Sequence, residues 1–334
     1  MSLQENNQLW QIGIGAALAQ AVSTVAELGV PDLIERGSAR PVAELAAETG
    51  CHEHSLYRCL RFLASRGIFE EQGQRSFALT PLAEALRTDA EGSFRAGARL
   101  FGFLFPGVGE FEHCLRTGKS GFTKAFGQPV FEYLAGHPEV APMFDAAMMA
   151  IHGPETAAML VAYDFSGIGT LADIGGGNGS LLTATLRKYP EMKGLLFDLG
   201  HVSGRAKANI KAAGLTGRCD VREGNFFESF PAGADAYLMR HIIHDWTDEQ
   251  SIQILKNCRA VVPQHGRVLI VGPVVPAGND PSPAKEEDIA MLIHPGGIER
   301  TEEEYRELFD AAGLELTGVT PTTSPVSVIE GRPV

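Results

Sequence analysis

The segment that decides the fold reads Leu171-Ala172-Asp173-Ile174-Gly175-Gly176-Gly177-Asn178-Gly179-Ser180. An apolar run with one carboxylate leads into a glycine-rich turn, and an amphipathic stretch at 181–188 follows. This order predicts a strand, a turn and a helix, as at the start of an open α/β sheet. Glycine adopts positive φ without steric cost and lets a ligand approach the backbone. The turn is therefore predicted to hold a ligand at the edge of a sheet.

The residues of this turn do not match the motifs for two of its common ligands. A dinucleotide fingerprint counted from Gly175 would need its third glycine at position 180, where the chain has Ser180. A P-loop would end in Lys followed by Ser or Thr, and the turn lacks that ending. A small zwitterion joined to a nucleoside, without a pyrophosphate, fits the turn better.

Short apolar strands alternate with amphipathic helices from residue 169 onward, which is typical of a parallel sheet covered on both faces. The last two strands have no full helix between them and are predicted to form an antiparallel hairpin at the sheet edge. The predicted strands cover 171–174, 194–198, 219–222, 234–239, 267–271, 314–319 and 327–330.

Helices dominate the start of the chain. Helical patterns cover 10–35, ending at Gly29-Val30-Pro31, then 41–49 and 54–66, and short strands at 67–69 and 76–79 flank a turn. Three helices and a small hairpin make a winged-helix pattern, which also occurs in DNA-binding regulators. The third helix does carry basic residues, but acidic residues surround them, and an apolar stripe runs along the helix. Packing or dimerisation is therefore favoured over DNA binding.

Phenylalanines are dense between residues 101 and 131, as in a pocket for a flat apolar ligand, although each one has core packing as its ordinary role. Near residue 165 the pattern changes from helices to alternating strands and helices. We expect a winged-helix dimerisation domain at 1–95, a helical linker and substrate-pocket region at 96–165, and a cofactor-binding catalytic domain at 166–334.

Composition narrows the function classes. The 334 residues carry a formal net charge of −13, which argues against nucleic-acid or anionic-membrane partners. The five cysteines are scattered and never spaced C-x-x-C, so the sequence suggests neither a disulfide framework nor a thiolate zinc site. No stretch approaches the length of uninterrupted apolar residues that a membrane span needs, and no leader is evident. A cytoplasmic location is expected.

Six motifs follow one another between residues 172 and 314: ADIGGGNGS, FDLGHV, GNFFESFP, RHIIHDWTDEQ, LKNCRAV and GGIERTEEEYRELFDAAGL. On these motifs the chain resembles the small-molecule O-methyltransferase family of plant caffeate enzymes and bacterial polyketide-tailoring enzymes. The resemblance implies an α/β, Rossmann-like class I methyltransferase domain with a mostly parallel seven-stranded sheet. It also implies S-adenosylmethionine as cofactor, a homodimer, and dimerisation as the role of the winged-helix domain.

The resemblance also assigns cofactor residues. Asp198 ends the second strand at the ligand edge of the sheet, where a carboxylate can accept both ribose hydroxyls. Gly175 would line the methionine part, and Asn225 and Phe226 would flank the adenine. Arg240 would lie near the carboxylate end. The full cofactor set is Asp173, Gly175, Gly177, Asp198, Asn225, Phe226, Arg240 and Trp246.

The resemblance makes His244 the catalytic base, oriented by Glu299, with Asp245 and Trp246 completing the HDW signature. Methyl transfer needs alignment and removal of the proton from the nucleophile. A neutral imidazole can accept the proton of a phenol near pH 7. His241 and His244 could instead be half of a metal site, but too few further ligands stand at a plausible spacing. No metal is expected.

Two positions depart from the family pattern. Asn225 stands where the family usually has Asp, and its side-chain carbonyl can still accept from the adenine amino group. Gly272 stands where many members carry a second glutamate beside the histidine. Glu299 would then have to orient and charge-stabilise the imidazole alone.

The sequence thus predicts an O-methyltransferase acting on a hydroxyl of a small aromatic or polyketide-like molecule. Met148 and His152 are weaker candidates for the walls of the substrate pocket. One alternative keeps the cofactor but catalyses a rearrangement, cyclisation or hydroxylation, and the departures at 225 and 272 motivate it. The second alternative is a winged-helix DNA-binding regulator.

Overall fold

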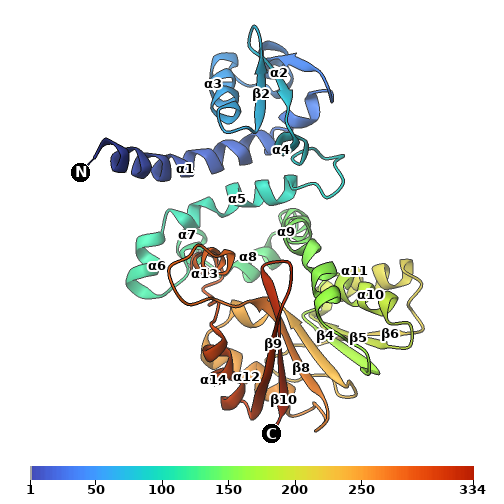
Figure 1. Ribbon diagram of the computed structural model, residues 1–334. Helices are drawn as coiled ribbons and strands as arrows, with labels where there is room; N and C mark the ends of the chain where they lie inside the picture. Colours follow the sequence, from blue (N-terminus) through green and yellow to red (C-terminus); the bar gives the residue numbers. More distant parts are fainter. Residues whose placement is uncertain (1) are drawn as a thin grey trace. The chain divides into compact units, whose positions relative to one another are not determined.

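A computed structural model describes residues 2–334, without the side chain of His201, and the chain divides into two compact units (Figure 1). The first unit contains the start of the chain through Gly109 together with 130–153, and the second contains 110–129 and 154–334. The division follows contacts within the chain, so the expected domain boundaries at 95 and 165 stay predictions.

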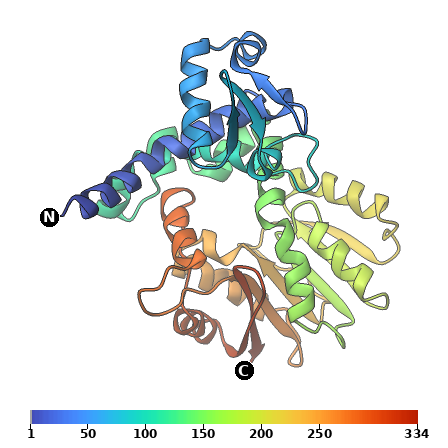
Figure 2. The same cartoon turned by 45° about the horizontal axis from the view of Figure 1, so that its top comes forward.

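The first unit is built on three helices, α1 (Leu3–Glu27), α2 (Val42–Thr49) and α3 (Glu53–Ala64), and a small sheet (Figure 2). The sheet has the order β1-β3-β2, with β1 at Ala39–Pro41, β2 at Phe69–Gln72 and β3 at Ser76–Leu79. Buried Leu60 and Leu63 from α3 and Phe69 and Phe77 from the hairpin fill its core. The winged-helix prediction is confirmed, and β1 adds a strand to the predicted hairpin.

Three predicted boundaries in this unit were wrong, both ends of the first helix and the start of the first hairpin strand. The first helix begins at Leu3 because Ser2 and Glu5 form a capping box, and it ends at Glu27 before a short 3₁₀ turn at Val30–Leu33. The first hairpin strand begins at Phe69, two residues later than predicted. Gly67 has φ of +74° and ends α3, so residues 67 and 68 belong to the helix terminus.

Helix α1 is apolar and long. Its length and composition alone would suit a membrane span, with a mean hydropathy of 1.3 over eighteen residues, and most of it is exposed in this chain. Such a helix is weak evidence for a membrane, because a helix that packs against another protein chain has the same composition. The expectation that no membrane is involved stays a prediction.

The rest of the first unit is helical. A glycine lets α5 (Arg95–Val108) approach α1 closely, since a Cβ at Gly102 would lie 2.1 Å from the Ser23 hydroxyl oxygen. Pro154 lies inside α9 (Ala141–Ala162), where the helix passes from the first unit to the second. The helices are α4 (Pro81–Glu84), α5 (Arg95–Val108), α8 (Val130–Gly136) and α9 (Ala141–Ala162).

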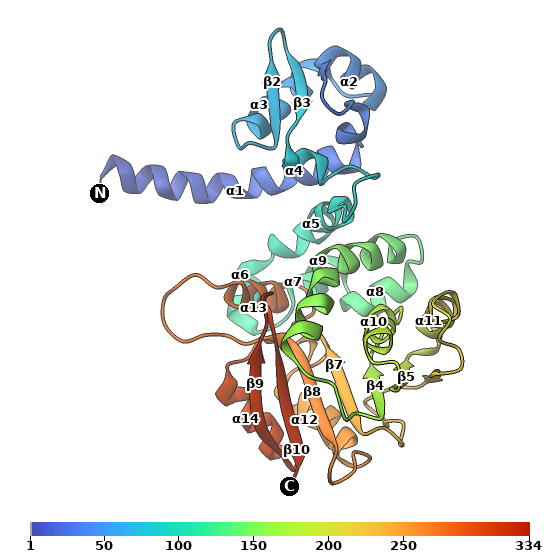
Figure 3. The same cartoon turned by 45° about the vertical axis from the view of Figure 1, so that its right-hand side comes forward.

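The second unit carries a seven-stranded sheet of order β6-β5-β4-β7-β8-β10-β9 (Figure 3). The first five strands in this order are parallel, and β10 pairs antiparallel with both β8 and β9, which confirms the predicted edge hairpin. The strands are β4 (Thr170–Ile174), β5 (Lys193–Asp198), β6 (Cys219–Glu223), β7 (Ala236–Arg240), β8 (Arg267–Pro273), β9 (Leu314–Pro321) and β10 (Val326–Pro333).

Both faces of this sheet are covered, which explains the nearly continuous apolar character of its central strands. One face packs against α12 (Asp248–Arg259) and α14 (Glu302–Ala311) through buried residues such as Leu255 and Phe309. The other face packs against the end of α9, α10 (Ser180–Lys188) and α11 (Gly200–Ala212). The fold class predicted from the sequence is confirmed.

Three further helices of the second unit lie together: α6 (Phe111–Thr117), α7 (Gly121–Phe126) and α13 (Pro283–Ile293). The hydroxyl of Ser120 donates to the carbonyls of Ile293 and His294 and so ties the start of α7 to the end of α13. The phenylalanine-rich stretch is divided between the units, with Phe122 and Phe126 stacked at 4.2 Å in the second.

Candidate functional site

Three neighbouring strands bring the predicted cofactor residues to one edge of the sheet. β5, β4 and β7 are adjacent and parallel, so the turn after β4, Asp198 at the end of β5 and Arg240 at the end of β7 meet there. Gly175, Gly177 and Gly179 have φ values of +66°, +56° and +77°. The turn therefore needs glycine at these positions, as the sequence predicted.

Side chains crowd the turn at Gly175 and Gly176, whereas the space beside Gly177 is open. A Cβ at Gly175 would lie 2.3 Å from the Ile242 side chain, and one at Gly176 would lie 2.9 Å from a carboxylate oxygen of Asp173. A Cβ at Gly177 would meet nothing within 4 Å among the described residues. The backbone amide of Gly177 donates to Asp198 at 2.8 Å, so this carboxylate also fixes the turn. The open side above Gly177 is where a ligand can approach the backbone.

Asp173 is a buried carboxylate beneath this turn. Its Oδ2 atom finds no hydrogen-bond partner among residues 2–334. Burial raises the pKa of Asp173 to about 7, although the charge of Arg240 works in the opposite direction. Arg240 is held by a 2.8 Å hydrogen bond to the Thr156 hydroxyl on α9. A carboxylate in this state favours a ligand that brings a positive charge and N–H donors.

Aromatic rings line the other side of the turn. Phe226 lies within 4.0 Å of the Cβ position of Gly175 and meets Trp246 edge to face, with ring centroids 6.1 Å apart. Phe227 also meets Trp246 edge to face, at 4.7 Å. Asn225 accepts the backbone amide of Phe227 at 3.0 Å. Its side-chain carbonyl thus shapes the turn that carries Phe226, a contact that the sequence did not predict.

His244 lies in a short 3₁₀ turn at Ile243–Asp245, directly after β7. It is buried, and its Nδ1 forms a hydrogen bond with the buried carboxylate of Glu299. Because a carboxylate only accepts, Nδ1 carries the proton and Nε2 holds the lone pair in the neutral ring. Nε2 lies 3.6 Å from an Asp245 carboxylate oxygen. This is the arrangement of a general base with an orienting partner.

Opposing effects set the pKa of His244. Burial lowers the pKa. The charge of Asp245, the hydrogen bond and charge of Glu299, and the charge of Glu287 raise it by more, and the pKa of His244 is about 9. The carboxylates therefore outweigh the burial. The imidazole of the ligand-free protein is a stronger base than an ordinary histidine and is largely protonated at neutral pH.

The segment 297–300 docks onto the histidine turn and delivers Glu299. A Cβ at Gly297 would lie 1.9 Å from the carbonyl oxygen of His244, and the amide of Ile298 donates to that same oxygen at 2.8 Å. The buried guanidinium of Arg300 donates to the carbonyls of Ile243 and Trp246 and pairs with Asp248. The capping box of Thr247 and Gln250 then begins α12.

Sequence reasoning missed Gly297 and Arg300, although both belong to the quoted motif GGIERT. It also missed Glu287 on α13, whose carboxylate joins the site, so Glu299 does not stand alone beside His244. His241 was considered only as a metal ligand. It has a φ of +53°, which is unusual outside glycine, and it lies 2.7 Å from a Glu155 carboxylate oxygen.

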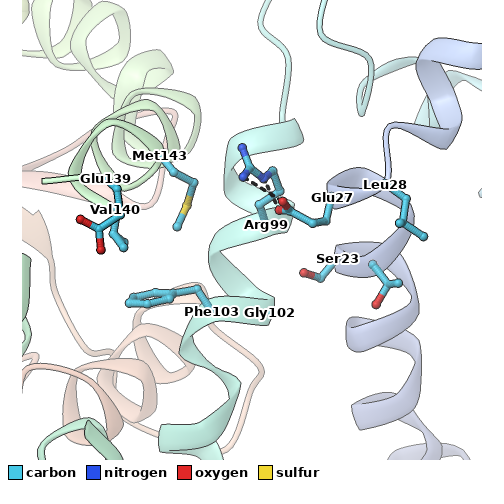
Figure 4. A pocket seen from close by; sticks show the side chains of 10 residues that line it. Ser23, Glu27, Leu28, Arg99, Gly102, Phe103, Glu139, Val140 and Met143 are labelled. Carbon is cyan, nitrogen blue, oxygen red and sulfur yellow. Dashed lines mark hydrogen bonds and ion pairs between the residues drawn. The ribbon is translucent and has the colours of Figure 1, made fainter. Parts of the chain in front are cut away.

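Met148 and His152 lie on the part of α9 that belongs to the first unit, and both are partly buried. Their role as pocket walls stays a prediction. The first unit also contains a hollow of about 450 Å³ between α1, α5 and residues 139–143 (Figure 4). Glu27 of α1 and Arg99 of α5 form an ion pair beside it, and Phe103 lies at its wall.

Two protein families match the chain in order. Residues 10–89 match the O-methyltransferase dimerisation domain, and residues 109–315 match the O-methyltransferase domain. The two matches agree with the winged-helix unit and the seven-stranded sheet described above.

Individual relatives match over nearly the whole length. The chain is 40% identical to a phenazine O-methyltransferase of Lysobacter antibioticus, covering 98% of this chain and 96% of that protein. It is 36% identical to an O-demethylpuromycin O-methyltransferase of Streptomyces alboniger, covering 96% and 87%. A solved O-methyltransferase of neocarzinostatin biosynthesis, in complex with S-adenosylmethionine and 2-hydroxy-5-methyl naphthoic acid, superimposes with a TM-score of 0.86 at 33% identity. That match covers 95% of this chain and 96% of that one.

Proposed function

We propose that this chain, which belongs to the S-adenosylmethionine-dependent O-methyltransferase family, methylates a hydroxyl of a small aromatic or polyketide-like natural product, with His244 as the base. The observation that carries the proposal is the buried pair of His244 and Glu299, one strand away from the glycine turn. One relative is a phenazine O-methyltransferase and the solved structure holds 2-hydroxy-5-methyl naphthoic acid, which supports an aromatic acceptor.

The residues around the turn fit S-adenosylmethionine. The unpartnered oxygen of Asp173 suits the cofactor ammonium, and Arg240 suits its carboxylate. Asp198 accepts the amides of Gly177 and Leu199, and its carboxylate at the end of β5 suits the ribose hydroxyls as donors. Phe226 offers an apolar ring to the adenine. Gly175 and Gly177 keep the backbone open. Trp246 meets the ring of Phe226 edge to face and so helps to hold it in place.

The chemistry asks little of the protein beyond alignment and a base. The sulfonium supplies a methyl group that is already activated for in-line displacement. His244 accepts the proton of the acceptor hydroxyl at Nε2, because Nδ1–H is engaged with Glu299. Glu299 holds the ring in that tautomer and stabilises the imidazolium that forms. Asp245 adds negative charge on the Nε2 side.

The decisive experiment needs no knowledge of the natural acceptor. Titration calorimetry with S-adenosylmethionine and with its demethylated product is expected to give micromolar binding of both. A panel of hydroxylated naphthoates, phenazines and simple phenols is then tested by mass spectrometry for a methyl-sized gain. Tight cofactor binding together with an acceptor that is converted without gaining a methyl group would favour the rearrangement, cyclisation or hydroxylation alternative.

We further propose a homodimer built on the first unit, in place of a DNA complex. Helix α1 exposes Leu3, Leu9, Trp10 and Ile12, an apolar face that a second copy can cover. Light scattering is expected to give twice the chain mass, and Trp10→Glu combined with Ile12→Glu is expected to give monomers. The matched control is Leu115→Glu, which changes an exposed leucine of α6 in the second unit. Dimers that persist in the double variant contradict this interface.

We also propose that the protein is cytoplasmic and does not bind DNA. All five cysteines are free, which suits a reducing cytoplasm. The surplus of acidic residues predicts no retardation of genomic fragments in a gel-shift assay at low salt.

A further inference from the structure

A third carboxylate belongs to the histidine site and has no role in the chemistry described so far. Glu287 lies on α13, and the ligand atoms of His244, Glu287 and Glu299 all lie within 4.8 Å of one another. Its side chain is 21% exposed, whereas that of Glu299 is fully buried. One Glu287 oxygen lies 3.9 Å from Nδ1 of His241. Glu287 therefore stands between two imidazoles.

We propose that Glu287 is a positioning residue for the base, the second carboxylate of a three-residue group with His244 and Glu299. It raises the basicity of His244 through space, whereas Glu299 acts through a direct hydrogen bond. The proposal rests on the proposed role of His244 and goes beyond it, because it assigns a function to a side chain of a different helix.

The fold gives α13 a reason to present this residue. The next residue, Asp288, accepts the backbone amide of Glu299 at 3.0 Å. The amides of Gly296 and Gly297 both donate to the carbonyl of Met291 at the end of the same helix. One helix thus fixes the backbone of the Glu299 segment through Asp288 and aims Glu287 at the imidazoles. The two glutamates are thereby held in a defined relation to each other.

Strand β8, next to β7, has no carboxylate at Gly272 that could take the role of Glu287. β8 passes the site at Gly272, where a Cβ would lie 3.7 Å from the Tyr305 hydroxyl and would clash with nothing. Tyr305 is buried, and the charges of both Glu299 and Glu287 help to raise its pKa. β8 brings no carboxylate to this corner because residue 272 is glycine, so α13 supplies the second negative charge.

His241 is the second group that faces Glu287. Its Nε2 pairs with Glu155 at 2.7 Å, and its ring centroid lies 5.0 Å from that of His244. The distance of 3.9 Å between a Glu287 oxygen and Nδ1 of His241 is longer than a hydrogen bond. Three carboxylates act on the pKa of His244, those of Asp245, Glu299 and Glu287, while the ring of His241 and the buried guanidinium of Arg300, which donates to the carbonyl of Ile243, also lie beside this turn. An imidazolium at His244 is favoured by that balance.

The test is the Glu287→Gln variant, with Glu286→Gln as the matched control on the same helix, where residue 286 is exposed. Histidine labelled with ¹⁵N lets NMR follow each imidazole with pH, and the His244→Ala spectrum assigns the resonance. The titration midpoint of His244 is expected to fall by about one pH unit in Glu287→Gln and to stay unchanged in Glu286→Gln. Glu287→Asp, which keeps the charge on a shorter side chain, is expected to lie between the wild type and Glu287→Gln.

This readout does not depend on methyl transfer, so it separates the two proposals. A failure of every phenol to gain a methyl group would count against the proposed function and leave the NMR result standing. A His244 midpoint that is the same in wild type and Glu287→Gln would overturn the role of Glu287 even in an active enzyme. In an active enzyme, the pH profile of kcat/KM is expected to move in the same direction as the NMR midpoint, with cofactor affinity unchanged.

Discussion

The glycine turn after β4 and the histidine turn after β7 stand on adjacent strands of one sheet, yet they are assembled from the chain in different ways. The glycine turn comes almost entirely from residues 173–179, and it covers a carboxylate with an unpartnered oxygen. The histidine turn gathers carboxylates from three places in the chain around one imidazole. Asp173 in the first site keeps an unpartnered carboxylate oxygen, the second site has surplus negative charge, and a cationic cofactor suits both.

The largest expected effect comes from removing the centre of the histidine site. His244→Ala is expected to lower the rate of methyl transfer roughly a thousandfold, because general-base catalysis contributes on that order. The affinity for S-adenosylmethionine should stay within about twofold, since His244 is not part of the glycine turn. Steady-state kinetics and calorimetry measure the two quantities separately. His265→Ala, at an exposed histidine before β8, is the control, and full activity in His244→Ala contradicts the assignment.

The second prediction concerns the docking of the segment that carries Glu299 onto the His244 turn, and it changes no charged residue. Gly297→Ala places a methyl group 1.9 Å from the carbonyl oxygen of His244, so the segment carrying Glu299 must move. A displacement of about 1 Å in a positioning group can cost roughly a hundredfold in rate, which is the expected loss. Gly318→Ala is the control, because its Cβ meets nothing within 4 Å. An active Gly297→Ala enzyme would mean that Glu299 needs no docking.

The same contrast explains what the sequence could reveal. The glycine turn and Asp198 were predictable because each ends a strand of clear apolar pattern, and parallel strands bring their carboxyl ends to one edge. His244 and Glu299 were identified only through the family motifs. Glu287 was not found, because nothing local distinguishes it from its exposed neighbour Glu286. The positive φ of His241 and the side-chain contact of Asn225 with the Phe227 amide likewise depend on packing that the pattern does not contain.

The third prediction acts on the glycine turn. Asp173→Asn is expected to weaken S-adenosylmethionine binding at least about tenfold, because a charge-assisted hydrogen bond to the ammonium is lost. The same change should stabilise the ligand-free protein. The folded-state pKa of Asp173 lies near 7, above its unfolded value, so the wild type loses stability as pH rises from about 4 to 7.

Asparagine does not ionise, and the melting temperature of the variant is therefore expected to exceed that of the wild type by about 3 °C or more at pH 8 and to match it near pH 4. Thermal scans of the ligand-free proteins at several pH values measure the difference. Asp235→Asn is the control, because that carboxylate is partly exposed and accepts the amide of Thr170. A variant that is less stable than the wild type at pH 8 would mean that ionised Asp173 supports the empty turn.

The smallest expected effect compares the two glutamates within the histidine site. A base must be unprotonated, so kcat/KM for an acceptor whose own hydroxyl stays protonated is expected to rise with pH and level off. The midpoint should lie between the ordinary value of 6.5 and about 9, because the cofactor sulfonium opposes the carboxylates that raise the pKa of His244. Glu299→Gln removes a buried, hydrogen-bonded charge and Glu287→Gln a partly exposed one, so both shift the midpoint downward, Glu299→Gln by more. Equal shifts would show that burial and hydrogen bonding add nothing to the charge of Glu299, and the two carboxylates would then be interchangeable in setting the base.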